Sequence, residues 1–532
     1  MPSRRLIALA VLLVFLTSTR AGPARCQQSS QSEKEQEILR IQQSIEARDL
    51  DQARRQLREA AKQYPTDGGI DNLLGIVEAQ QGNYIGAEKS FRQAIRREPK
   101  FTGAYLNLGR LYQENAAADP SAPAKALGVY AVVLEYDPGN AEAHYQSAAL
   151  FLTRGQFEES LAHTSRLSSE SQQSAQTLSI RCADYAGLGN VEGTDQAARQ
   201  LMAAPDLSEL DAQQALLGLV PGKRDDLTVA LLESLQNRQQ LSAALLQKLG
   251  SAYARLHRLE EARTALEKSF SEGNPTVGLL LELTRIARQQ KDYQGALGYL
   301  AHARDLDPGN AVVHYYFGIV CVDLNLIAEA WDSFERAVKL QPENADFNYA
   351  MGAASSFRHD PAEAIPYFQK YLELKPGDPR GKLAMGATLF RAKDYPAALP
   401  WLKQSAQIPE TATKAHYYLG AIALDEGRLP EALPELQETL KDKPDYPDAL
   451  AELGRYYLMQ KEYRQAEDYI ERALKIEPDH YKANFYLLTL YTRTKDARRE
   501  AQAKRFAELE KLLAEKTQEF LRMVEARPLG TP

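Results

Sequence analysis

The sequence predicts an all-α protein in which about 13 antiparallel helix pairs stack into a solenoid, closed by a long C-terminal capping helix. The first observation is a 34-residue period that begins with Gly318, Ala330 and Pro342. The same residue types return as Gly352, Ala364, Pro376, Gly386, Ala398, Gly420, Ala432, Pro444, Gly454, Ala466 and Pro478, with Pro409 one residue early. The second observation is that each period holds two apolar runs at helical spacing, separated by a short break. One such pair cannot bury its apolar face alone, so neighbouring pairs must stack.

The first 26 residues have the layout of a secretory signal peptide. Arg4 and Arg5 precede an unbroken apolar run over residues 6–16, and residues 17–21 are small and polar. The apolar run is shorter than the roughly 20 residues of a membrane span. We therefore expect export to a bacterial periplasm or cell envelope, with cleavage after Ala21 or Cys26. An uncleaved N-terminal membrane anchor is the alternative.

The period divides the rest of the chain into blocks. Degraded signature positions separate two regular stretches, and an insertion of five residues is expected as a loop at 115–123. The expected parts are a polar linker at 27–32, an N-terminal repeat block at 33–173, degenerate helical repeats at 174–242, a regular block at 243–480, a terminal repeat with its capping helix at 481–527, and a tail at 528–532. Whether 174–242 is a hinge or a binding site stays open.

Each recurring residue has a physical role in this scheme. Gly318 and Ala330 are small, which lets the two helices of a pair cross closely, and the bulky residue at position 24 of each unit fills space between pairs. Pro342 ends the second helix because proline cannot continue one. In the last helix the apolar residues form one stripe, namely Phe506, Leu509, Leu512, Leu513 and Phe520. A terminal unit needs one apolar side, so this helix should be the cap; a coiled-coil partner helix is the alternative.

These positions resemble the tetratricopeptide-repeat family. The matching residues are Leu74, Gly75, Ala87, Phe91, Ala94 and Pro99 in 68–101; Phe317, Gly318, Ala330, Phe334, Ala337 and Pro342 in 311–344; and Leu453, Gly454, Tyr457, Ala466, Ala473 and Pro478 in 447–480. Position 4 departs from the family's aromatic residue, for example at His314 and Asn348. The resemblance implies a right-handed superhelix that binds a protein or peptide in its concave groove.

The groove should be lined by positions 2, 5, 9, 12 and 13 of the first helices, counting Ala311 as position 1. Position 5 is repeatedly aromatic, which suits peptide recognition. A packing role for these rings is the alternative. The candidate partner-binding residues are Tyr145, Arg285, Arg288, Tyr315, Ile319, Asp323, Tyr349, Arg391, Tyr417, Asp425, Arg455, Phe485 and Arg493.

No catalytic, cofactor or metal motif is present in the sequence, so we expect no enzyme activity and no cofactor. His144, His314 and His416 share position 4 of their units, which indicates a structural slot. The net charge of −7 and the absence of a basic stripe disfavour nucleic acid. Cys182 and Cys321 lie on different repeats, so no disulfide is expected, and no second apolar stretch reaches membrane-spanning length.

These observations favour a non-enzymatic, exported scaffold that binds protein or peptide partners, with a role in assembling envelope or secretion machinery. Two alternatives stay open. The chain could be the regulatory or substrate-recruiting subunit of an envelope enzyme complex, or it could assemble with copies of itself.

Overall fold

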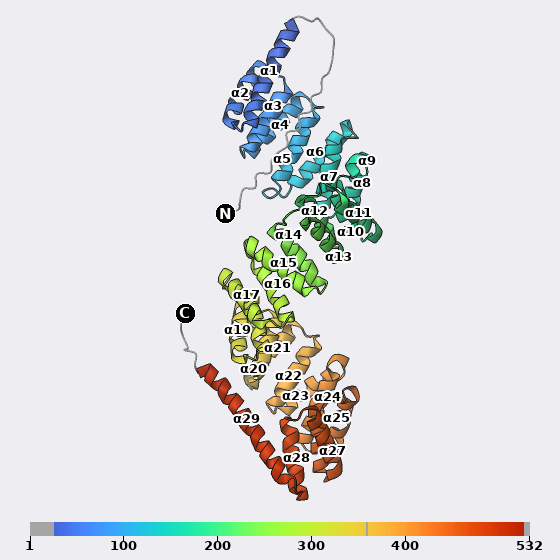
Figure 1. The fold of residues 1–532 in the computed structure, drawn as a ribbon, viewed down its shortest axis with the longest axis vertical. Helices are drawn as coiled ribbons and strands as arrows, with labels where there is room; N and C mark the ends of the chain where they lie inside the picture. Colours follow the sequence, from blue (N-terminus) through green and yellow to red (C-terminus); the bar gives the residue numbers. More distant parts are fainter. Residues whose placement is uncertain (1–25, 358–359, 526–532) are drawn as a thin grey trace. The chain divides into compact units, whose positions relative to one another are not determined.

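The computed structural model describes residues 26–357 and 360–525, and it contains 29 helices and no strand within these ranges. The predicted signal segment therefore lies outside the described residues, apart from Cys26. The helices form two compact units, one that ends at Gly273 and one that begins at Asn274, and each is described by itself. Both are built from successive antiparallel helix pairs, as expected for an all-α solenoid (Figure 1).

The first unit contains fifteen of the described helices. They are α1 (Cys26–Glu46), α2 (Leu50–Gln63), α3 (Gly68–Gln80), α4 (Tyr84–Arg97), α5 (Thr102–Glu114), α6 (Ala122–Tyr136), α7 (Ala141–Thr153), α8 (Phe157–Thr164), α9 (Ser169–Gln172), α10 (Ala175–Gly187), α11 (Val191–Ala203), α12 (Glu209–Leu219), α13 (Asp225–Gln236), α14 (Ala243–Arg255) and α15 (Leu259–Glu272).

The second unit contains the remaining fourteen described helices. They are α16 (Val277–Gln289), α17 (Tyr293–Leu306), α18 (Ala311–Asp323), α19 (Ile327–Leu340), α20 (Ala345–Phe357), α21 (Pro361–Leu374), α22 (Pro379–Arg391), α23 (Tyr395–Ala406), α24 (Pro409–Asp425), α25 (Leu429–Asp442), α26 (Pro447–Met459), α27 (Tyr463–Ile476), α28 (Tyr481–Thr494) and α29 (Arg499–Glu525).

In many of the pairs, a glycine in the first helix lies against a bulky residue in the second. A Cβ added at Gly318 would lie 2.4 Å from the ring of Phe334, and one at Gly454 would lie 2.4 Å from Ile470. Phe334 also clusters with Ala350 and Met351 of the next first helix. The bulky side chain thus fills space within its own pair as well as between pairs, which is more than the sequence indicated.

Second helices sit between consecutive first helices. In the second unit, α19 contacts α18 and α20, α21 contacts α20 and α22, and α23 contacts α22 and α24. First helices also touch one another directly: α22 contacts α24, and α24 contacts α26. Side chains of neighbouring first helices can therefore meet across 30 or so residues of sequence, which matters for the site below.

The turn inside most pairs has a recurring backbone conformation, which the longer connection between α5 and α6 lacks. One residue in it has a positive φ, and these residues are Arg48, Gly82, Gly155, Gly189, Lys223, His257, Lys291, Asn325, Lys393, Gly427, Lys461 and Lys495. From Gly155 to Lys495 they follow in steps of 34 residues or, once, twice 34. The register therefore continues through 174–242, where the signature side chains are lost. The larger step from Gly82 to Gly155 contains the five-residue insertion.

Two segments differ in detail from what the sequence predicts. Residues 27–32, expected as a linker, are part of α1, because this stretch of Gln and Ser contains no proline or glycine to prevent a helix. The inserted loop is shorter than expected, since Pro123 belongs to the first turn of α6, a position where its missing N–H costs nothing.

The C-terminal helix α29 starts beside α28 (Figure 1). Phe506 and Leu509 are buried there, with the Phe506 ring 5.1 Å from Tyr481 and 5.7 Å from Phe485 between centroids. This is the capping contact predicted for the helix. Leu512 is exposed, and the side chains of Leu513 and Phe520 lie outside the described residues. Among the described helices, none is both long and apolar enough to cross a membrane.

Candidate functional site

The position-5 rings of the second unit pack at the seams between neighbouring helices. The Tyr315 ring lies 5.0 Å from Phe347, on the next first helix, and 5.9 Å from Phe334. Tyr349 lies 5.6 Å from Phe368 and is half-buried. Burial raises the pKa of both tyrosines. Of the two roles left open for these rings, packing is the one that the geometry supports.

Tyr417 is the most deeply buried of the predicted aromatic residues in the second unit. Its side chain is 6% exposed, and its ring lies 5.5 Å from Tyr446. Helix α24 begins at Pro409, four residues earlier than the 34-residue register implies, and Tyr417 lies near its middle, covered on both sides. The burial of this ring favours a packing role for Tyr417.

Other predicted candidates have mixed environments. Tyr145 is half-buried against Ala183 in the first unit, and burial raises its pKa to about 12. Ile319 is half-buried beside Phe334. Phe485 stays 46% exposed, although one edge meets the cap through Phe506.

Two of the three charged candidates at the start of the second unit form an ion pair. Arg288 on α16 bonds to Asp323 at the end of α18, with Nη2 to Oδ1 at 3.3 Å and a shorter contact from Nε to Oδ2. Arg285 is exposed, with Glu282 3.8 Å away on the same helix. Arg288 and Asp323 were both predicted to bind a partner, and the structure shows that they already form an ion pair with each other.

A larger network joins α24, α26 and α28. Asp425 accepts hydrogen bonds from the Tyr395 hydroxyl at 2.5 Å and from Arg455 Nη1 at 2.6 Å. The same Arg455 nitrogen reaches Glu452 Oε2 at 3.3 Å, and Lys482 Nζ lies 2.7 Å from Glu452 Oε1. Glu452 is fully buried. We call these five residues the α24–α28 network.

Charge balance explains how this network tolerates burial. Burial acts to raise the pKa of Asp425, but the bonds from Tyr395 and Arg455 outweigh it, and the pKa lies below its usual value. Burial and the same Asp425 contact raise the pKa of Tyr395 to about 12. The two acids and two cations neutralise one another, so the network has little net charge. Its hydrogen bonds fix the orientation of its side chains.

Arg391 lies at the end of α22 and is not part of any ion pair. Its Nε donates to the carbonyl of Ala387 in its own helix at 3.4 Å, and no carboxylate of the described residues lies within ion-pair distance. It is exposed. Arg493, at the end of α28, donates to the Leu458 carbonyl at 3.0 Å. Arg391 and Arg493 are therefore the two predicted cations that have no carboxylate partner among the described residues.

Tyr418 links Arg391 to the network. Its ring lies 5.2 Å from Phe390, the residue before Arg391. Burial raises the pKa of Tyr418, while the positive charges of Arg391 and Lys482 lower it and Asp448 raises it further. Charges from α22, α26 and α28 therefore act on one half-buried hydroxyl group. We call Phe390, Arg391 and Tyr418, with the adjacent Lys482, the Arg391 surface.

Sequence reasoning missed Tyr418, Glu452 and Lys482. Tyr418 and Glu452 occupy position 6 of their units, one residue beyond the position examined, and Lys482 occupies position 2. The sequence does contain a signal for Glu452, because this residue is the one acid in the otherwise apolar stretch of residues 449–454.

The polar residues at position 4 fill a structural slot, as the shared position indicated. His314 Nε2 lies 3.0 Å from the carbonyl of Pro308, and Asn348 Nδ2 donates to that of Pro342 at 2.8 Å. His144 contacts Pro138 in the same way at 3.0 Å. His416 instead bonds to Glu435 at 2.6 Å, because the proline before it comes one residue early. Across the described ranges, no three His, Cys, Asp or Glu side chains gather as metal ligands.

Comparison with known proteins gives matches to sequence models of the tetratricopeptide repeat. They cover residues 45–99, 72–122, 247–311, 318–379 and 356–413 with one model and 423–498 with another, together more than half of the chain. Protein O-mannosyl-transferase TMTC3 of Homo sapiens is 25% identical over 245 residues, which are 45% of this chain and 26% of that protein. The match thus spans about a quarter of that relative.

Similar solved structures include YrrB, a tetratricopeptide-repeat protein with an unusual peptide-binding site, at 23% identity. The alignment covers 35% of this chain and 95% of YrrB, with a TM-score of 0.28. A tetratricopeptide repeat protein from Parabacteroides merdae is 16% identical over 47% of this chain and 98% of its own, with a TM-score of 0.40. The Cut9–Hcn1 assembly is 13% identical over 90% and 93%, with a TM-score of 0.38.

Proposed function

The chain belongs to the tetratricopeptide-repeat family, a fold that generally serves as a non-catalytic scaffold for protein–protein interaction, and from that premise we propose that it holds a polypeptide partner on the Arg391 surface. The partner brings an acidic side chain to Arg391 and an apolar or aromatic one to Phe390 and Tyr418. No chemistry is performed on it.

The unmatched charge of Arg391 is the observation that carries this proposal. The neighbouring cations Arg455 and Lys482 are held by Glu452, whereas Arg391 can turn to a partner without losing an ion pair. A guanidinium beside aromatic rings combines charge with apolar area, and Arg and Tyr are enriched among residues that dominate binding. The α24–α28 network supports the surface from behind by fixing α24 against α26.

We further propose that the scaffold works outside the cytoplasm, in assembly of envelope or secretion machinery. The support is the basic start and the apolar run at 6–16, which are typical of an export signal. Fractionation of cells that express a C-terminally tagged chain tests this. The wild type should be exported, and Leu13→Arg, which places a charge in the apolar run, should stay in the cytoplasm. Equal distribution of both proteins would contradict export.

The binding proposal is tested by crosslinked capture from the native cell with Arg391→Glu and Tyr418→Ala. We expect each change to weaken partner capture about tenfold or more, since a desolvated charged contact contributes roughly 1–3 kcal/mol. Both residues are at the surface or half-buried, so circular dichroism should show an intact fold.

The matched control is Lys403→Glu, which makes the same charge reversal at an exposed position of the second helix α23. It should leave capture unchanged. The same partners captured in the same amounts by wild type, Arg391→Glu and Tyr418→Ala would refute a role for this surface.

A further inference from the structure

The α7–α8 pair of the first unit contains a contact between two imidazole rings. His144 Nδ1 on α7 lies 2.9 Å from His163 Nδ1 on α8, and the ring centroids are 5.1 Å apart. His144 is buried, and His163 is half-buried with its ring stacked on Phe151. The structural slot at position 4 accounts for His144 and leaves open what its partner on α8 does.

The surroundings of His144 fix the positions of the hydrogens in this contact. His144 Nε2 lies 3.0 Å from the Pro138 carbonyl, which can only accept, so Nε2 carries the hydrogen. In the neutral ring Nδ1 is then an acceptor, and His163 Nδ1 donates the hydrogen of the contact. The contact therefore depends on an uncharged His144, because a proton on its Nδ1 would bring two N–H groups face to face.

Protons enter this contact in two steps. The first can go to His163, whose Nδ1 would remain a donor, but burial lowers the pKa of His163 and the charge of His144 lowers it further. No carboxylate on the described parts of α6, α7, α8 or α10 opposes that shift. The second proton would go to His144 Nδ1 and would remove the hydrogen bond between the helices.

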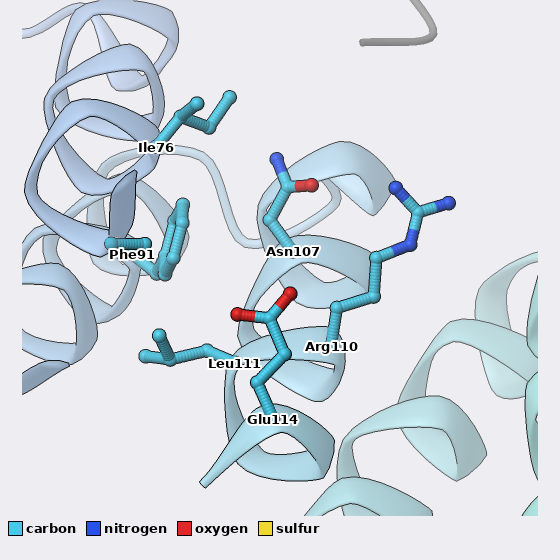
Figure 2. A pocket seen from close by; sticks show the side chains of 7 residues that line it. Ile76, Phe91, Asn107, Arg110, Leu111 and Glu114 are labelled. Atoms are coloured by element: carbon cyan, nitrogen blue, oxygen red, sulfur yellow. The ribbon is translucent and has the colours of Figure 1, made fainter. Parts of the chain in front are cut away.

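Charged groups on the helices packed around this pair are engaged with other residues. Figure 2 shows Arg110 on α5, and its guanidinium bonds to Glu142 of α7 at 2.6 Å. Asp184 of α10 interacts with Ser160 of α8 and with neither histidine. These carboxylates therefore do not neutralise an imidazolium in the contact.

The second unit has a carboxylate at the equivalent position. His416 Nδ1 lies 2.6 Å from Glu435, and these two residues are 19 apart in the chain, as are His144 and His163. A carboxylate accepts from a charged imidazole. That contact can keep its hydrogen bond when the ring at position 4 is charged, which the His144–His163 contact cannot do.

We propose that the His144–His163 contact makes the packing of α8 on α7 sensitive to pH, so that α8 is held at neutral pH and released in acid. Because α8 also packs on α10, its release loosens the contact with the degenerate repeats at 174–242. The device shares no residue with the Arg391 surface, so each proposal can fail without the other.

The sign follows from the lowered pKa of His163. An unfolded histidine has a pKa of about 6.5, so below that value the unfolded chain binds more protons than the folded chain, and stability falls as the pH falls. Asp184 acts in the opposite direction, because its raised pKa favours the folded chain in acid. A test must therefore separate the two groups.

Hydrogen exchange of the full chain, read by mass spectrometry, measures the protection of α7 and α8 at pH 7.5 and pH 5 after correction for the intrinsic effect of pH. Wild type should lose protection in acid by roughly tenfold, the effect of one buried hydrogen bond. His163→Gln should lose most of this response, since its amide takes up no proton and can donate to neutral His144 or accept from the charged ring. Asp184 is present in both proteins, so the difference between them isolates the histidine pair.

His163→Glu copies the contact of the second unit and should reverse the sign, with more protection at pH 5 than at pH 7.5. His257→Asn is the matched control, because His257 is exposed and its left-handed backbone, with φ 58°, suits asparagine. It should leave the response of α7 and α8 unchanged.

Two results would overturn the proposal. One is an equal acid response in wild type and His163→Gln, and the other is a loss of protection in acid by His163→Glu. Far-UV circular dichroism at pH 7.5 verifies that each variant is folded. If His163→Glu does not fold, the comparison of wild type with His163→Gln decides alone.

Discussion

The ring of Phe334 occupies the space directly over Gly318, where a Cβ would come within 2.4 Å of the ring atom Cε1. The contact joins the first and second helix of one pair, and it recurs between Gly75 and Phe91 and between Gly109 and Tyr130. The glycine is therefore required by the neighbouring ring rather than by its own backbone, which is helical.

Gly318→Val should destabilise the second unit by about 1–3 kcal/mol, because the added methyl groups must displace a buried ring. Gly298→Ala is the control, since a Cβ there meets nothing within 4 Å and the helix should gain stability. Urea unfolding monitored by far-UV circular dichroism measures both. Equal midpoints for wild type and Gly318→Val would contradict the close contact, and Phe334→Leu should partly rescue the valine variant.

Asp184 on α10 should make the first unit less stable at neutral than at acidic pH. Its side chain is fully buried, and burial raises its pKa to about 7. Ser160 opposes this rise only in part, because its hydroxyl donates to the Ala148 carbonyl at 3.0 Å, and neither carboxylate oxygen of Asp184 has a hydrogen-bond partner among the described residues.

The sign follows from the raised pKa. Between the unfolded value near 4 and about 7, the unfolded chain loses its proton while the folded chain keeps it, so stability falls across this window and is level above it. Asp184→Asn should raise stability by roughly 1–3 kcal/mol at pH 8 and by much less at pH 4. Equal gains at both pH values in denaturant titrations would contradict this assignment.

Glu452 and Lys482 should be energetically coupled. Glu452 is fully buried and Lys482 is partly exposed, so removing the acid leaves Lys482 without its carboxylate partner and leaves Arg455 with Asp425 alone. Glu452→Gln should cost about 2–3 kcal/mol, less than a fully buried pair, because water reaches the lysine. A double-mutant cycle with Lys482→Met measures the coupling. Strictly additive effects would show that the 2.7 Å contact is energetically silent.

Phe506 should hold the capping helix in place. It is buried against Tyr481 and Phe485, and Phe506→Ala should release α29 at a cost of about 3 kcal/mol, without unfolding the pairs before it. Hydrogen exchange should accelerate in α28 and α29 alone. Leu512→Ala, at a side chain 42% exposed, serves as the control and should change little. Unaltered exchange in Phe506→Ala would mean that α29 is held by other contacts.

Some features of this fold could be predicted from the sequence, and others were harder to predict. The period, the helix pairs, the small residue at Gly318, the end of α19 before Pro342 and the capping role of Phe506 were all predictable, because each depends on contacts within one unit or with its immediate neighbour. The irregular stretch 174–242 was harder. Its signature side chains are gone, while Gly189, Lys223 and His257 still hold the turn conformation at 34-residue steps.

The sequence by itself therefore determined the architecture: a helix pair repeats its local chemistry every 34 residues, and stacking is the way to bury its apolar face. Only the tertiary structure decided which side chains are available to a partner. Neighbouring first helices touch along one seam. Tyr417 and Tyr418 are consecutive in α24 and therefore point in different directions, so that Tyr417 is buried and Tyr418 is half-buried. The same packing brings Asp425, Arg455 and Lys482 from three helices into one network and leaves Arg391 without a carboxylate partner among the described residues. Such differences depend on how helices approach across units, which no single period encodes.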